Sequence, residues 1–427
     1  MIKHVLILLF FPMLLQAQEI RNMTQLFDSL KTHPVTQGDE IRIEQALAGK
    51  EIAYSKLYPN IDLFGKYDYA STPTGMLPVP PNDILAMVKD PLVAQPFSEN
   101  IFRLGVTISM PVFVASIFPL ASKAKMMVRS AESQQNINLL KNEAVIVGAN
   151  ANLLYMQALE QALEKKKASL LKTKEFVIIK VNNGRAPEST LLNISNGINQ
   201  IDILENDLAL KKQEVKEIIQ SLTGIALSQP IKMDQIGTFK DGGLKSLDPL
   251  REKVEADRLG YQAEKEKLLP AVFLQGSYSY NSANAYNNGN HVTNDYTTIG
   301  AMVKIPLFAK DQYTQIKKGR LDYEASKNEL DRMNLELSSQ ASQLQSSMLL
   351  LDNSIQLYEN SVKEKEQLLE IATVSYQSDQ MTMEDYLKYE DDVILEKSKL
   401  FNAQAEKWQT LMKLCVIFGN NIEEIIK

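Results

Sequence analysis

Cysteine and histidine are scarce in this chain. Its 427 residues include one cysteine, Cys415, and three histidines. A single cysteine excludes an internal disulfide, and none of the histidines belongs to a metal-binding His-Glu-x-x-His motif. A Gly-x-Ser-x-Gly motif and a phosphate-binding glycine loop are also missing. We therefore expect a protein that is not an enzyme and that uses no cofactor and no metal.

Long hydrophobic runs are missing after residue 17. No later stretch approaches 18 consecutive apolar residues, so no transmembrane helix is expected. The formal net charge is −6 and there is no basic patch, which argues against a nucleic-acid partner. The one apolar run, Val5 to Leu15, follows Lys3 and precedes a small-residue site ending at Ala17. Residues 1–17 are therefore predicted to be a signal peptide, and the mature chain is expected to be exported.

Proline is nearly absent from four stretches, residues 116–181, 188–222, 312–376 and 383–418, in which Pro119 is the only one. Helix interiors exclude proline, so these stretches are predicted to be long helices. The third would measure about 100 Å at about 1.5 Å per residue, a length that suits a coiled coil rather than a globule. Its apolar residues follow heptad spacing, at Met348, Ile355, Val362, Leu369 and Tyr376. A coiled-coil spacer would show the same pattern.

Each pair of long helices is separated by a short polar turn. Asn182-Asn183-Gly184 ends the first helix, and Ser378-Asp379-Gln380 ends the third. Asparagine and glycine suit the left-handed residue that ends many helices, and Thr382 followed by acidic residues suits a helix start. The sequence thus predicts two helical hairpins with tips near residues 182–190 and 377–385.

Two segments of alternating character precede each helical hairpin. Apolar and polar residues alternate along residues 61–69, 102–110, 272–280 and 299–305. Alternation over about ten residues is typical of membrane-spanning strands, with one face toward lipid and the other toward water. A soluble hairpin packed on its own helices is the alternative, but the export signal and the tyrosines near the strand ends favour the membrane. Residues 281–295 are expected to form an ordinary surface loop. The apolar loop at residues 71–99 is expected either to cap a pore mouth or to pack on neighbouring copies.

The second half of the chain repeats the first. Met110-Pro111-Val112-Phe113 recurs as Ile305-Pro306-Leu307-Phe308, 195 positions later. We accordingly expect a first repeat at residues 18–224, a linker at 225–247 and a second repeat at 248–427. The first repeat would hold a strand pair at 59–111 and a helical hairpin at 116–223. The second would hold a strand pair at 270–306, a hairpin at 311–418 and a tail at 419–427.

Four strands cannot close a membrane barrel. The smallest outer-membrane barrels have about eight strands, and an open sheet in lipid would leave its edge groups without hydrogen bonds. Copies of the chain must therefore associate. Two copies would give eight strands, whose interior side chains fill, whereas three would give twelve and leave room for a channel.

This order of elements resembles the TolC-like outer-membrane efflux proteins, over essentially the whole mature chain. The most specific points of resemblance are the turns at 181–184 and 376–379 and the strand ends, which match the barrel–tunnel junction (Pro111, Phe113, Pro306, Phe308). The resemblance implies an α+β membrane protein with two tandem repeats, whose homotrimer forms a twelve-stranded β-barrel in the lipid of the outer membrane and an α-helical periplasmic tunnel. It also implies a passive exit duct in efflux or type I secretion. The partners would be a periplasmic adaptor, also called a membrane fusion protein, and an inner-membrane pump of RND, ABC or MFS type.

In that family the second hairpin closes the periplasmic end through the pattern Tyr-x-x-Gly-x-Arg-x-x-x-Asp-x-x-Asp. Tyr376 and Asp385 match it, whereas Met381 replaces the arginine and Lys388 the second aspartate. The resemblance implies that Tyr376 belongs to the closing network and Asp385 to an acidic ring of three. Asp385 could instead serve as the acid of a helix start, a role that Glu384 could also fill. Lys388 is a candidate for an inter-helix ion pair whose partner the sequence does not identify.

The hairpin tips correspond to the turns at which the family binds its adaptor. These turns are Asn183-Gly184-Arg185 and Asp379-Gln380-Met381. The alternative function is an outer-membrane adhesin or receptor, or a structural coiled-coil protein, that uses the loop at 71–99. A periplasmic adaptor fits less well, because adaptors carry one helical hairpin between compact β domains and this chain carries two hairpins that alternate with strand pairs.

Overall fold

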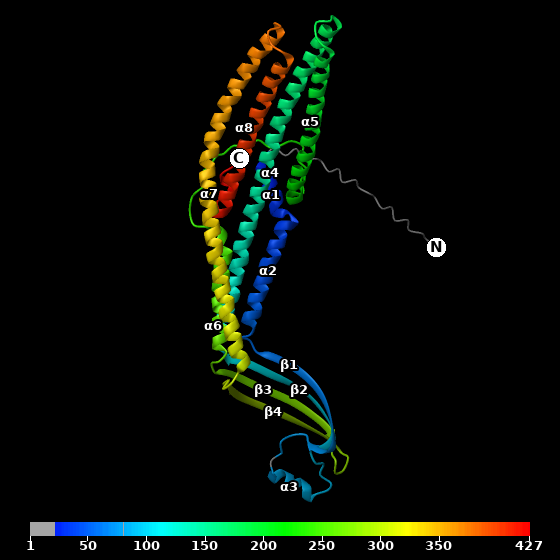
Figure 1. Cartoon of the computed structure of the whole chain (residues 1–427). Coiled ribbons are helices and arrows are strands. Elements are labelled where there is room, and N and C mark those ends of the chain that lie inside the picture. Colours follow the sequence, from blue (N-terminus) through cyan, green and yellow to red (C-terminus); the bar gives the residue numbers. More distant parts are fainter. Residues whose placement is uncertain (1–21, 80) are drawn as a thin grey trace, which may run out of the picture. The chain divides into compact units, whose positions relative to one another are not determined.

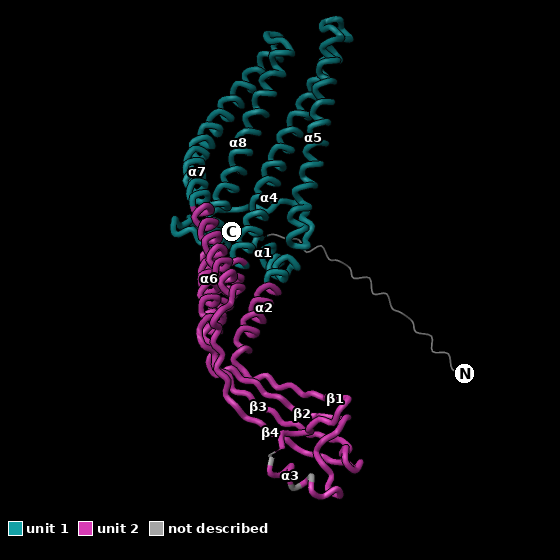
Figure 2. The backbone as a smooth tube through the Cα atoms, turned by 60° about the horizontal axis from the view of Figure 1, so that its bottom comes forward, with its two compact units in different colours: residues 1–39, 135–246, 335–427 teal, residues 40–134, 247–334 magenta. Residues whose placement is uncertain are grey.

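The computed structural model describes residues 22–79 and 81–427, so the predicted signal peptide lies outside the described residues. The chain divides into two compact units (Figure 2). Unit 1 comprises residues 1–39, 135–246 and 335–427, and unit 2 comprises residues 40–134 and 247–334. Helix and sheet are both present, as the sequence predicts (Figure 1). No described helix combines the length and the apolar character needed to cross a membrane.

Unit 2 contains one antiparallel sheet of four strands. The strands are β1 (Asn60–Gly75), β2 (Phe97–Phe113), β3 (Ala271–Asn284) and β4 (His291–Lys304), and their order in the sheet is the same as in the chain. β2 pairs with β3 even though about 160 residues separate them along the chain, for example at Val106 and Tyr278. The two strand pairs therefore form a single surface, and β1 and β4 are its edges.

The alternation in the sequence gives this sheet one apolar and one polar face. Cross-strand pairs place Leu63, Val106 and Tyr278 in one row on the apolar face. The neighbouring row on the polar face contains Asp62, Thr107 and Ser277. Side chains on the apolar face are strongly exposed, with Leu63 at 75% and Ile299 at 81% of their maximal accessible area. This face has no covering layer among the described residues.

The strands are longer than their hydrophobic alternation suggests. The predicted loop at 281–295 is wrong at both ends, because β3 continues to Asn284 and β4 begins at His291. Here the ladder joins polar residues such as Asn281 and Asn294, which a reading based on hydrophobicity assigns to a loop. The predicted loop at 71–99 is likewise shorter in the structure, because β1 continues to Gly75 and β2 begins at Phe97. It contains a short helix, α3 (Pro81–Lys89).

Helical segments complete unit 2. They are α6 (Asp248–Glu266) and parts of α2 (Pro34–Ser55), α4 (Ile117–Asn182) and α7 (Lys310–Gln377). Gly260 of α6 approaches the Lys123 side chain of α4, because a Cβ at this position would lie 2.9 Å from its flexible Nζ. Gly319 of α7 approaches α6 in the same way, since its Cβ would lie 3.3 Å from the Cα of Tyr261.

Unit 1 contains the greater part of the two predicted helical hairpins, including their tips. The first joins α4 to α5 (Glu188–Thr223), and the second joins α7 to α8 (Met383–Phe418), within one or two residues of the predicted bounds (Figure 1). Of the predicted heptad positions on α7, Val362 and Tyr376 are buried, whereas Met348, Ile355 and Leu369 are half-buried. One hydrophobic cluster contains Met156, Leu163, Leu170 and Val177 of α4 together with residues of the other three helices. Burial of these spaced side chains is what keeps helices of this length in register.

A second core lies where α1 (Met23–Thr32) and the C-terminal residues meet α4. It includes residues of α1, Ile146 of α4 and the C-terminal residues Ile422, Ile425 and Ile426. The 225–247 segment, which was predicted to be a linker, packs here. The side chain of Asn150 donates to the carbonyl of Ile231 at 2.7 Å and accepts from its amide at 2.9 Å. Two short 3-10 turns, Lys245–Leu247 and Ile422–Glu424, complete the described elements.

Candidate functional site

The two hairpin tips end their first helices with the same turn. Gly184 follows α4 with φ of 65°, and Asp379 follows α7 with φ of 60°. In each turn the amide of this residue donates three residues back and the next amide donates five residues back, from Arg185 to Lys180 and from Gln380 to Ser375. This pair of backbone hydrogen bonds satisfies the last carbonyl groups of a helix. The adaptor-docking turns predicted from the resemblance, including Asn183 and Met381, lie in or beside these two structures.

Asp385 takes part in the start of α8. The hydroxyl of Thr382 accepts from the amide of Asp385 at 3.1 Å and donates to its carboxylate at 2.7 Å. The helix-start role that the sequence offered for Asp385 is therefore real, and it leaves the other carboxylate oxygen free to act elsewhere. Lys388 is exposed and forms no ion pair with any residue of the described chain.

Lys180 connects the two tips. This residue in the last turn of α4 forms an ion pair with Asp379 of the second tip. Its Nζ also lies 4.7 Å from the centre of the Phe176 ring and 5.7 Å from that of the Tyr376 ring. Because a cation over an aromatic face is attracted to it, Lys180 holds the first hairpin to the second by two kinds of contact, an ion pair with Asp379 and a cation–π contact with Tyr376.

Tyr376 is buried by stacking. Its ring lies 5.2 Å from the ring of Tyr386 with 20° between their planes. The hydroxyl of Tyr386 donates to Oε1 of Glu390 at 2.8 Å, and the hydroxyl of Ser169 on α4 donates to the same oxygen at 2.5 Å. The closing network that the resemblance implies for Tyr376 would therefore rest, within one chain, on Tyr386, Glu390 and Ser169.

Glu390 carries a carboxylate into the apolar seam of the hairpins. The residue is 4% exposed, and its Oε2 atom has no hydrogen-bond partner. Burial raises the pKa of Glu390 above its ordinary value, and the bonds from Ser169 and Tyr386 offset only part of that rise. The sequence contains a signal for this residue, because Glu390 is a charged residue at a position of the apolar series Met383, Tyr386 and Val393, which follows helical spacing. Ser169 and Lys180 gave no comparable signal.

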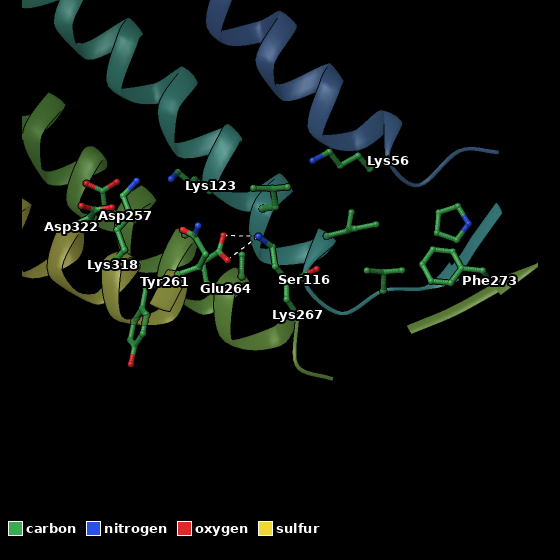
Figure 3. A pocket seen from close by; sticks show the side chains of 18 residues that line it. Lys56, Ser116, Lys123, Asp257, Tyr261, Glu264, Lys267, Phe273, Lys318 and Asp322 are labelled. Carbon is green, nitrogen blue, oxygen red and sulfur yellow. Dashed lines mark hydrogen bonds and ion pairs between the residues drawn. The ribbon is translucent and has the colours of Figure 1, made fainter. Parts of the chain in front are cut away.

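Unit 2 contains a pocket where the strands meet the helices. Its volume is about 530 Å³ and it lies between α4, α6, α7 and the ends of the strands (Figure 3). Four lysines and three acidic residues line it (Lys56, Lys123, Lys267, Lys318, Asp257, Glu264, Asp322). Glu264 binds Lys267 at 2.7 Å and accepts from Gln312 at 3.0 Å. The charges nearly balance, so the lining favours neither a cation nor an anion strongly.

The predicted junction residues differ in their surroundings. Pro111 lines this pocket, next to an irregularity in the pairing of β2 with β3. Pro306 is half-buried, whereas Phe113 and Phe308 are exposed. The described residues contain no group of three or more acidic, histidine or cysteine side chains placed to hold a metal ion.

With this geometry, the chain has the fold of the TolC-like outer-membrane channels, as the sequence predicts. One such structure is the outer membrane protein VceC from Vibrio cholerae, with a TM-score of 0.76 and 17% identity over 93% of this chain and 96% of that one. The CmeC outer membrane channel of Campylobacter jejuni has a TM-score of 0.76 and 16% identity over 93% and 85%. The open-state MtrE channel of Neisseria gonorrhoeae has a TM-score of 0.74 and 12% identity over 94% and 90%.

The likeness is one of structure rather than of sequence. No protein-family model matches the chain, and no curated protein sequence matches it. With TM-scores of 0.74–0.76 at identities of only 12–17%, these matches show a shared fold and nothing finer. The function must therefore be argued from the molecule's own surfaces.

Proposed function

We propose that this protein is a passive exit duct of the outer membrane. Three copies would join their four-stranded sheets into a twelve-stranded barrel, and their helical hairpins would form a tunnel in the periplasm. Solutes would enter from an inner-membrane pump of RND, ABC or MFS type through a periplasmic adaptor. The adaptor would bind the tips that contain Gly184 and Asp379. The chain would supply a path and no energy.

The observation that carries this proposal is the uncovered apolar face of an open sheet. Exposed apolar side chains on this face run from Ile61 to Tyr69 along β1, eight residue steps or about 26 Å at about 3.3 Å per residue. This length matches the apolar band of about 25 Å on outer-membrane barrels. Two exposed tyrosines, Tyr67 and Tyr69, lie at one end of the band, as in the aromatic girdles of such barrels.

The helices support association of copies. Beyond the buried heptad seam, α7 exposes a second apolar set, which includes Leu350, Leu357 and Ile371 at 63–68% of their maximal area. Helix α5 similarly exposes Leu192, Ile203 and Leu210. Contiguous exposed apolar surface usually marks a protein contact, and neighbouring hairpins of a tunnel wall would cover these side chains.

The tips would form the closed end of the duct. Tyr376 and Asp385 come from the family pattern, and three copies of Asp385 would form an acidic ring. Lys388, exposed one turn further along α8, could pair across to another copy. The contact of Lys180 with Asp379 would hold the two tips of one chain together. Opening would then require both hairpins to move as one body.

Native mass spectrometry and planar-bilayer recording of the purified protein test this proposal together. We expect assemblies of three chains and discrete conductance steps. Asp385→Ala should raise the conductance, since it removes the proposed ring. Glu384→Ala is the matched control, because it removes a charge from the same first turn of α8 but leaves the bond to Thr382. Single chains without conductance would exclude a duct, and equal effects of the two variants would remove Asp385 from its gate.

A further inference from the structure

Arg103 fastens the connection between β1 and β2 to the polar face of the sheet. Its guanidinium binds Asp68 at 3.1 Å and the side chain of Asn281 at 3.0 Å, both on that face. It also donates to the carbonyl of Met76, the first residue of the connection, at 2.7 Å and to that of Gly75, the last residue of β1, at 3.4 Å. One side chain thus joins three strands to the chain segment that leaves them.

The connection, which we term the 76–96 loop, continues over the same face. Met76 is 1% exposed and packs with Ile101 and Ala283, which pair across β2 and β3. Ile101 and Ala283 also pair with Asp68 and Val292, so this row crosses all four strands. Without Met76 above them, Ile101 and Ala283 would stand exposed on a mostly polar face.

Asparagines of the β3–β4 turn hold the far part of the loop. Asn287 donates to the carbonyl of Val93 at 2.9 Å and accepts from the amide of Gln95 at 3.0 Å. Asn288 donates to the carbonyl of Leu92 at 3.1 Å. The loop is therefore tied at both ends, and α3 lies between these ties, beside the ends of the strands (Figure 1).

We propose that the 76–96 loop is a constriction at the outer end of the channel, latched by Arg103, that limits the size of solutes that pass. This inference rests on the proposed function, because in a closed barrel the polar face of the sheet is the inner one. A loop bonded to that face lies inside the barrel wall. Three copies of it would narrow the mouth to less than the bare barrel allows. Arg103 then determines selectivity by size, since it holds the loop against the wall at its root.

Thiol labelling of whole cells from outside tests the constriction independently of the periplasmic end. Thr107→Cys places a reporter on the polar face of β2, exposed and about 13 Å along the strand from Arg103. The native Cys415 should stay silent, because it is buried and burial raises the pKa of its thiol to about 12. A small maleimide and a maleimide on a long polyethylene glycol chain are compared.

In the reporter background, the small reagent should react and the large one should react slowly. Arg103→Ala should increase the rate of the large reagent about tenfold, with the small reagent unchanged, because the mouth widens. Replacing residues 78–94 with a short Gly-Ser link should do the same. Arg103→Lys should fall between, since an ammonium group cannot bind two carbonyls and two side chains at once.

Lys66→Ala is the matched control. Lys66 pairs with Asp68 at 2.7 Å on the same face but has no bond to the loop, so this change removes an equal charge without releasing the latch. Equal rates of the large reagent with and without Arg103 or the loop would overturn the constriction. If even the small reagent failed at position 107 in the loop-replaced chain but labelled Val106→Cys on the other face, the polar face would not be lumenal, and the proposed duct itself would fail.

Discussion

At the residue scale, buried carboxylates set apart a few positions in long helices that are otherwise regular. Glu390 lies in the seam between the hairpins and Glu143 lies in the core near the chain ends. A buried carboxylate in apolar surroundings favours its neutral form. Both residues therefore make the stability of unit 1 depend on pH, and the dependence has the opposite sign to that of a carboxylate in a surface ion pair.

Glu143 gives the sharper prediction. Burial, followed by the nearby charge of Glu423, raises its pKa from 4.5 to about 7, while Lys31 opposes the rise. Its contribution to stability is fully present below about pH 4.5 and is lost as pH rises through about 7. The free energy involved is at most about 3 kcal/mol. We expect Glu143→Gln to match the native protein at pH 4.5 and to exceed its thermal unfolding midpoint at pH 8.

The control is Glu175→Gln, an exposed glutamate on the same helix. It should leave the unfolding midpoint unchanged at both pH values. Native and Glu143→Gln midpoints that run parallel from pH 4.5 to 8 would show that the Glu143 carboxyl does not titrate in this range.

At the element scale, glycine in the left-handed conformation ends three of the four long helices. Gly184, Gly224 and Gly419 have φ of 65°, 71° and 65°. Their surroundings differ. A Cβ at Gly184 would meet nothing within 4 Å, whereas a Cβ at Gly419 would lie 2.7 Å from the Cβ of Lys245. Comparing Gly184 with Gly419 therefore separates the cost of backbone strain from the cost of steric crowding.

Alanine at each position should destabilise the protein by different amounts. Gly184→Ala adds only the strain of a left-handed residue, about 1 kcal/mol. Gly419→Ala adds a clash with the packed segment that leads into α6, and should lower the free energy of unfolding by more. Chemical denaturation followed by helical circular dichroism measures both. Equal losses of unfolding free energy in the two variants would mean that the Lys245 side chain moves away from the new Cβ at no cost.

Elements also differ in how far the sequence could predict them. The long helices were predicted closely, since proline exclusion and heptads report directly on helix geometry. The strands were predicted too short, because Asn281 and its neighbours continue the ladder with polar side chains. Backbone hydrogen bonds extend a sheet whatever its side chains, so hydrophobic alternation marks only the part that meets an apolar environment.

At the scale of the whole molecule, the main unmet requirement is the unpaired backbone groups at the two edges of the sheet. β1 and β4 have partners on one side only within the described chain. An apolar face in lipid would leave those edge groups without hydrogen bonds at several kcal/mol each. In the proposed duct, pairing β1 of one copy with β4 of the next would satisfy them, and the ring would close when the last copy met the first.

A chain with Leu63→Cys and Ile299→Cys should report this closure. The two residues lie on β1 and β4 of the same apolar face, three strand spacings of about 4.8 Å and two residue steps of about 3.3 Å apart, which is about 16 Å within one sheet. A shorter thiol cross-linker cannot join them inside one chain but can join them between copies. We expect covalent dimers and trimers on denaturing gels, with nothing larger.

Each single variant is the control. With β1 beside β4, like positions do not meet, so Leu63→Cys alone or Ile299→Cys alone should remain monomeric after cross-linking. If the double variant gave nothing but monomers, edge pairing would be contradicted. Products of more than three chains would contradict a closed trimer.

The sequence by itself determined the local character of the molecule: long helices with heptad seams, turns at Gly184 and Asp379, and strands with one apolar face. These follow from near neighbours, since periodicity and backbone conformation are local properties. Only the tertiary structure decided which distant groups meet: Lys180 with Asp379, Ser169 with Glu390, and Arg103 with the carbonyl of Met76. Such contacts depend on how separate helices and strands pack, and no spacing along the chain encodes them.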